Sequence, residues 1–98
     1  MVSWPAKDFN LILEDVNLEN YLIIDIREHS EDRCIKLNKN ELHIPFSELL
    51  DQPSNIPQGK LLLYCKSGVR SNYAAFFLQK NGFNAFSLES GIIAISSE

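Results

Sequence analysis

Two short apolar runs set the strongest constraint on how this chain can fold. One run spans residues 21–26 and the other spans residues 61–65, and neither alternates between apolar and polar positions. A strand that faces water on one side alternates, whereas a strand buried on both faces is continuously apolar. We therefore expect both runs to be strands of a parallel sheet that is covered by helices.

Two weaker strand patterns accompany these runs, at residues 42–46 and 85–88. The clearest helix is expected from Ser71 to Asn81, and Gly82 supplies its left-handed C-terminal stop. One face of this helix is expected to carry four apolar side chains, Tyr73, Ala74, Phe77 and Leu78.

Two further helices are expected outside that segment. Pro5 suits the first position of a helix that reaches about Glu14. Ser47 can cap a short helix that continues to Leu50. Strands and helices therefore alternate, which predicts an α/β fold. We expect a three-layer sandwich with a mainly parallel central sheet flanked by helices.

Length, charge and cysteine content narrow the classes of protein. The 98 residues suit a single domain over 1–98, which could belong to a longer protein. The net charge of −4 and the scattered basic residues argue against nucleic-acid and anionic-membrane partners. Two cysteines and no secretory signal indicate a reducing compartment, so we expect a cytoplasmic protein. Cys34 is expected to be a packed residue.

The segment after the second apolar run carries the reactive chemistry. Ligands of open parallel sheets bind beyond the carboxyl ends of the strands, and Cys65 lies at such an end. Gly68 allows the chain to bend into the helix, where backbone N–H groups and the positive end of the helix dipole gather. Lys66 and Arg70 add positive charge. We expect Cys65 to ionise readily and to face an anion-binding pocket.

Four segments of this sequence resemble the rhodanese family. The loop is CKSGVR, residues 65–70, and the family pattern is Cys, two residues, Gly, one residue, Arg. Residues 24–28, IDIRE, resemble the family's Asp-Val-Arg-Glu stretch, and residues 44–49, IPFSEL, resemble its Ile-Pro-Leu region. Residues 82–92 resemble its closing Gly-Phe … Leu … Gly-Gly-Ile. The sequence also looks somewhat like the C-terminal rhodanese domain of molybdopterin-synthase sulfurylases, which pass sulfur to a carrier protein.

The resemblance implies a sulfurtransferase. By analogy, the Cys65 thiolate takes a sulfane sulfur from a small anionic donor such as thiosulfate, or from a persulfide, and holds it as a persulfide. A thiol acceptor or a sulfur-carrier protein then removes that sulfur. The donor is expected to contact five residues of the loop, Lys66, Ser67, Gly68, Val69 and Arg70. The resemblance implies no metal or organic cofactor.

Several residues also have a purely structural interpretation. Arg70 could pair with a carboxylate instead of binding an anion, and Lys66 could simply be solvated. Asp25 and Arg27 are expected to form an ion pair that supports the site without reacting. The two histidines, His29 and His43, have no metal-ligand spacing with the cysteines, so a zinc site is not expected.

Two other function classes stay open at this point. Residues 35–43 replace the family's usual Gly-His-Ile, and Ser90 replaces a usual Gly. The altered segment at residues 36–43 would suit a non-catalytic binding or regulatory module that kept the fold. A cysteine phosphatase is less favoured, because its loop has five residues between Cys and Arg, whereas four separate Cys65 from Arg70.

Overall fold

The computed structural model describes residues 3–5, 21–31, 41–89 and 91–96. The described residues form one five-stranded sheet with the strand order β1-β5-β4-β2-β3. All four strand pairs are parallel, as the apolar runs predicted. In chain order the elements are β1 Ser3–Pro5, β2 Tyr21–Asp25, β3 Leu42–His43, α2 Phe46–Asp51, a 3₁₀ turn Pro53–Asn55, β4 Lys60–Tyr64, α3 Val69–Lys80, β5 Asn84–Glu89 and α4 Gly91–Ser96.

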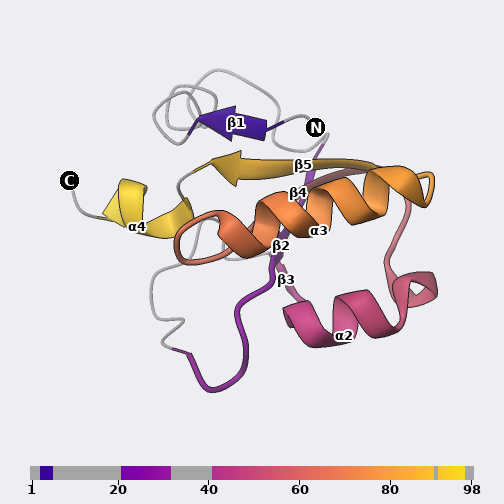
Figure 1. Cartoon of the computed structure of the whole chain (residues 1–98), viewed down its shortest axis with the longest axis horizontal. Helices are drawn as coiled ribbons and strands as arrows, with labels where there is room; N and C mark the ends of the chain where they lie inside the picture. The colour runs from indigo at the N-terminus through magenta and orange to yellow at the C-terminus, as the bar shows by residue number, and fades with distance from the viewer. Residues whose placement is uncertain (1–2, 6–20, 32–40, 90, 97–98) are drawn as a thin grey trace.

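The sheet is buried on both faces at its centre. The side chains that point to one face pack against α2 and α3 (Figure 1) in a cluster that includes Ile24, Leu61 and Leu63. The side chains of Ile23, Leu62 and Tyr64 alternate with these along β2 and β4, and they are buried as well. This double burial is the physical reason that neither run alternates in the sequence.

Helix α3 lies over β4 and β5 through its smallest side chains (Figure 1). Its buried residues are Ser71, Ala74, Ala75 and Leu78. Because most of these side chains are short, the helix backbone can approach the sheet closely. The expectation for Tyr73 was wrong, since 58% of this residue is exposed and its ring packs edge-to-face on Phe46.

Other local predictions also differ from the structure. Pro5 ends β1 at the edge of the sheet instead of opening a helix, a position where a strand tolerates a residue without an N–H group. The rest of the helix predicted from Pro5 lies outside the described residues, as does Cys34. Helix α3 begins at Val69, two residues before the predicted start.

Ser47 does not cap α2 from the position before the helix. The helix begins at Phe46, and Ser47 lies in its first turn. The carboxylate of Glu28 instead accepts hydrogen bonds from the backbone N–H and the hydroxyl of Ser47, both at 3.1 Å. A negative group at a helix N-terminus satisfies an unpaired donor and complements the helix dipole. The segment after β2 therefore holds the start of α2.

Candidate active site

The ends of two neighbouring strands place the predicted site residues together. Asp25 ends β2 and is paired in register with Tyr64, which ends β4. The pairing continues for one residue, because the N–H of Ile26 donates to the carbonyl of Tyr64 at 3.0 Å. Cys65 follows directly. The loop of Cys65 and the segment after Asp25 thus leave the sheet side by side.

The loop bends at Gly68 and returns a backbone donor to the sulfur. Gly68 has φ +94°, in the left-handed region, and it directly precedes the first residue of α3. Its N–H donates to the Sγ atom of Cys65 at 3.1 Å. The donor thus lies where it can stabilise negative charge that develops on sulfur during a reaction. Cys65 has 0% exposure, so a reagent reaches the sulfur only after a neighbouring group moves.

Three of the other loop residues lie at the surface. Lys66 and Ser67 are exposed, and so is Val69, at 73%, whereas Gly68 is buried. Arg70 is only half-buried. The hydrogen bond to Glu31 raises the pKa of Arg70 most, and Cys65, which lies close to it, adds to the rise. Donor binding by these residues stays a prediction.

Arg70 is engaged by Glu31 in a two-pronged ion pair. Its Nη1 donates to Glu31 Oε2 at 2.5 Å, and its Nη2 donates to Glu31 Oε1 at 2.7 Å. The N–H of Glu28 donates to the same Glu31 Oε2 at 2.6 Å. The hydrogen bond from Arg70 lowers the pKa of Glu31 to about 2, against the opposing effect of burial. In turn, the hydrogen bond to Glu31 raises the pKa of Arg70.

Asp25 and Arg27 form a buried ion pair beside the loop. Arg27 donates from Nε to Oδ1 of Asp25 at 3.0 Å and from Nη2 to Oδ2 at 3.1 Å. The same Nη2 donates to the Tyr64 hydroxyl at 3.3 Å, and that hydroxyl donates to Glu41 at 2.5 Å. Burial lowers the pKa of Arg27, but the hydrogen bond and charge of Asp25 outweigh it, so the pKa is raised.

The Tyr64 hydroxyl stays protonated within this network. Burial raises the pKa of Tyr64 well above its usual range, and the hydrogen bond to Glu41 adds to the rise. Arg27 is 3% exposed and Asp25 is 0% exposed, so each charge depends on the other. This network joins the end of β2 to the end of β4, directly before Cys65.

Two buried serines near Cys65 were missed by the sequence reasoning. The Ser71 hydroxyl lies 3.7 Å from Sγ of Cys65 and donates to the carbonyl of Gly68 at 3.1 Å. Ser87, on β5, donates to the Ser71 hydroxyl at 2.8 Å. The three-residue spacing was an available signal. Gly68 follows Cys65 by three positions and Ser71 follows Gly68 by three, so the turn into α3 brings Ser71 to the same side as Cys65. Ser87 had no local signal.

The start of α4, which is distant in the sequence, is hydrogen-bonded to the loop that contains Cys65. Backbone N–H groups of Ile92 and Ile93 donate to the carbonyls of Cys65 and Lys66, at 2.9 and 3.1 Å. Gly91 is packed so tightly here that an added Cβ would lie 2.3 Å from the carbonyl oxygen of Lys66. In Figure 1, α4 accordingly lies beside the N-terminal end of α3.

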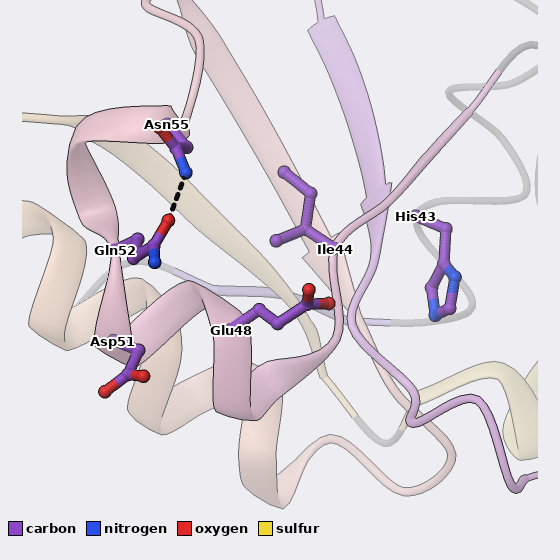
Figure 2. Close-up of a pocket in the computed structure, with 6 residues that line it drawn as sticks. All are labelled: His43, Ile44, Glu48, Asp51, Gln52 and Asn55. Carbon is purple, nitrogen blue, oxygen red and sulfur yellow. Dashed lines mark hydrogen bonds between the residues drawn. The ribbon is translucent and has the colours of Figure 1, made fainter.

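A separate polar pocket lies at α2, away from the Cys65 loop. Figure 2 shows its six lining residues, which come from β3, α2 and the turn that follows, and its volume is about 260 Å³. On one side of it, Asn55 donates a side-chain hydrogen bond to Gln52. None of the lining residues belongs to the loop of residues 65–70.

Metal binding and membrane crossing are two further properties that the described residues address. Within residues 3–5, 21–31, 41–89 and 91–96, no group of three or more His, Cys, Asp or Glu side chains is arranged to hold a metal ion. In the same part of the chain, no helix combines the length and the apolar character that crossing a membrane requires.

Comparison with protein families gives one match over nearly the whole chain. The family model described as "Rhodanese-like domain" matches residues 6–98. Among curated proteins, a tRNA sulfurtransferase of Vibrio campbellii is 40% identical over 70 residues, which cover 67% of this chain and 14% of that protein. The corresponding protein of Colwellia psychrerythraea is 42% identical over 69 residues, covering 66% of this chain and 14% of its own length.

Solved structures agree with the fold. A rhodanese-related protein from Thermoplasma volcanium superposes with a TM-score of 0.81 at 28% identity, covering 99% of this chain and 92% of that chain. The protein SSP1007 from Staphylococcus saprophyticus gives a TM-score of 0.82 at 24% identity, covering 100% of this chain and 96% of its own, and supports the fold alone. This chain spans only about one seventh of the length of the curated relatives.

Proposed function

The chain belongs to the rhodanese-like domain family, and we propose that it is a sulfurtransferase that carries sulfur as a persulfide on Cys65. One observation carries the proposal. Cys65 lies at the carboxyl end of a buried strand, and the N–H of Gly68, at the start of α3, points at its sulfur. This geometry aims a backbone donor at the atom that would act as the nucleophile, and the thiolate is the nucleophilic form of cysteine.

The proposed first step is a displacement at sulfur. The thiolate of Cys65 attacks the outer sulfur of thiosulfate, an Sγ–S bond forms, and the S–S bond of the donor breaks. Sulfite leaves with the electron pair of that bond, and Cys65 holds a persulfide anion. An organic persulfide reacts in the same way and releases a thiolate. The terminal sulfur then lies near the Gly68 N–H and Arg70, which can stabilise its negative charge.

The second step returns the sulfur to an acceptor. A thiolate or another nucleophile attacks the terminal sulfur of the persulfide, and the Cys65 thiolate leaves and is regenerated. The rate of such an exchange depends on the nucleophile, the leaving group and access to sulfur. The curated relatives are named tRNA sulfurtransferases, which supports transfer of the sulfur to an acceptor, and we expect that acceptor to be a thiol or a sulfur-carrier protein.

A sulfur donor has restricted access to the sulfur of Cys65. Cys65 is fully buried, whereas the flanking loop residues Lys66, Ser67 and Val69 are exposed. Arg70 is a half-buried group close to the sulfur, and both of its terminal nitrogens donate to Glu31. We propose that a donor reaches the sulfur by displacing this side chain.

Intact mass spectrometry after incubation with a sulfane-sulfur donor tests the proposal. Thiosulfate and the methanethiosulfonate anion serve as two donors, and the protein should gain one sulfur atom with at least one of them. Cyanide or a thiol should remove the added sulfur. Cys65→Ser should gain none, whereas Cys34→Ser, the matched control on the other cysteine, should load like the wild type.

Two results would redirect the interpretation. If the wild type gains no sulfur from either donor, the chain is better described as a binding or regulatory module that retains the fold. If the protein instead hydrolyses an aryl phosphate and Cys65→Ser abolishes that activity, the loop serves phosphate chemistry.

A further inference from the structure

We propose that Glu31 is a specificity-determining residue that makes Cys65 discriminate against doubly charged sulfur donors. This inference rests on the proposed function and adds to it the charge class of the donor. It predicts that thiosulfate, a dianion, is a poorer donor than an organic thiosulfonate or persulfide that carries a single negative charge at the reacting end.

The first observation is that the guanidinium of Arg70, a cation close to the sulfur, is already paired with a carboxylate. Both terminal nitrogens of Arg70 donate to the two carboxylate oxygens of Glu31, at 2.5 and 2.7 Å. A guanidinium in this two-pronged geometry keeps three of its five N–H donors, but the carboxylate offsets the positive charge that it would present to a sulfonate group. An anionic donor must therefore compete with a carboxylate that is already in place.

The second observation is that Glu31 is held where it is. Its Oε2 accepts the N–H of Glu28 at 2.6 Å in addition to the bond from Arg70, and its own N–H donates to the Glu28 carbonyl at 3.1 Å. About a quarter of the Glu31 side chain is exposed, so the pair is only partly screened by water. Because its pKa is lowered, Glu31 keeps its charge at any physiological pH.

The third observation is that the other charged side chains near the loop do not replace the positive charge of Arg70 that Glu31 offsets. Arg27 is buried and its guanidinium donates to both oxygens of Asp25. Lys66 is exposed, so its charge is strongly screened. The carboxylate of Glu28 lies at the start of α2 on Ser47. The positive charge that a dianion needs is therefore offset by the carboxylates beside it.

The effect should scale with the charge of the donor. Removing one negative charge about 6 Å from a donor in a water-like dielectric should speed loading about threefold for a monoanion and about tenfold for a dianion, because the interaction energy doubles with the donor charge. The dianion factor is thus close to the square of the monoanion factor. This relation separates a charge effect from a general change in loop geometry, which would alter both donors alike.

The test measures the second-order rate constant of sulfur loading on Cys65 by quenched-flow mass spectrometry. Thiosulfate and the methanethiosulfonate anion are each compared between the wild type and Glu31→Gln, so each donor is its own reference. We expect about a tenfold gain with thiosulfate and about a threefold gain with methanethiosulfonate. Higher salt should shrink both gains, and the gain for thiosulfate more.

A matched control removes the same charge elsewhere. Glu48, on α2, is two-thirds exposed and lines the pocket of Figure 2, so Glu48→Gln should leave both rate constants within about twofold of the wild type. Thermal melting establishes that each variant is folded, and Glu31→Ala replaces Glu31→Gln if the latter melts early.

The outcomes are distinguishable from a failure of the proposed function. If the wild type loads sulfur but Glu31→Gln changes both donors by the same factor, or neither, the specificity role is overturned and sulfur transfer stands. If the wild type loads from no donor, the proposed function itself fails. A larger gain with the monoanion than with the dianion would also overturn the inference.

Discussion

Replacing Gly91 by alanine tests whether the start of α4 fixes the loop that holds Cys65. Gly91 has φ +68°, and an added Cβ would lie 2.3 Å from the carbonyl oxygen of Lys66 and 2.7 Å from that of Cys65. Ordinary van der Waals contact begins near 3.4 Å, so the loop and α4 must separate by about 1 Å. Backbone occupies both sides of this contact, and a side-chain rotation cannot relieve it.

The expected cost follows from what that separation breaks. The N–H groups of Ile92 and Ile93 donate to the same two carbonyls at 2.9 and 3.1 Å. Losing both bonds costs about 1–3 kcal/mol, at about 0.5–1.5 kcal/mol each. Alanine in a left-handed conformation adds about 1 kcal/mol. The free energy of unfolding of Gly91→Ala should therefore fall by about 2–4 kcal/mol.

The assay compares this variant with a second glycine that has the same backbone problem but no contact. Gly82 has φ +88°, and an added Cβ would meet nothing within 4 Å. Gly82→Ala should lose only about 1 kcal/mol in urea unfolding and should load sulfur on Cys65 at the wild-type rate. Gly91→Ala should lose more stability and should load more slowly, because the loop carbonyls have moved.

Equal losses of stability in the two variants would refute this reasoning. They would show that only the backbone conformation matters at Gly91 and that the contact with Lys66 yields without cost. A large loss of stability with an unchanged loading rate would show that α4 stabilises the fold but does not position Cys65.

Three further predictions concern the ion pairs and the buried hydroxyls. Asp25→Asn leaves the buried charge of Arg27 uncompensated and should lower the free energy of unfolding by about 3–5 kcal/mol in urea titration, so an unchanged midpoint would contradict the role of the pair. Glu31 has a pKa of about 2 in the folded chain and about 4.3 when unfolded, so its contribution is present above pH 4.3 and is lost as the pH falls towards 2. The stability difference between wild type and Glu31→Gln should therefore shrink over that interval in acid titrations, and a constant difference would rule out this linkage. Ser71→Ala and Ser87→Ala should each cost about 1–3 kcal/mol, and the double variant should cost less than their sum, since additivity would mean that the two hydroxyls are not coupled.

The parallel sheet and the place of the reactive loop were predictable because they rest on local patterns. Continuous apolar runs at 21–26 and 61–65 predict doubly buried strands, and the structure pairs them in parallel. A glycine shortly after a strand-end cysteine predicts a sharp turn into a helix, and Gly68 has the required positive φ. Both signals lie within a few residues of the feature that they predict.

The position of Tyr73 shows where such local reasoning fails. Apolar spacing assigned it to the buried face, yet small residues, Ser71 and Ala75, occupy the positions against the sheet. Close packing of a helix on a sheet favours small side chains, and hydropathy does not register their size. The ring of Tyr73 instead covers Phe46 at the surface.

The residues that tune the site were not predictable, because their partners are distant in the chain. Arg70 and Glu31 are separated by 39 positions, and the α4 residues that hold the loop follow Cys65 by more than 25. Only the sheet topology brings these segments to the same edge: β2 and β4 are neighbours, so the segment after β2 meets the loop after β4. The sequence could single out Cys65 as the proposed nucleophile from its own neighbours. Which charge opposes it, and hence which donors it accepts, is set by strand order.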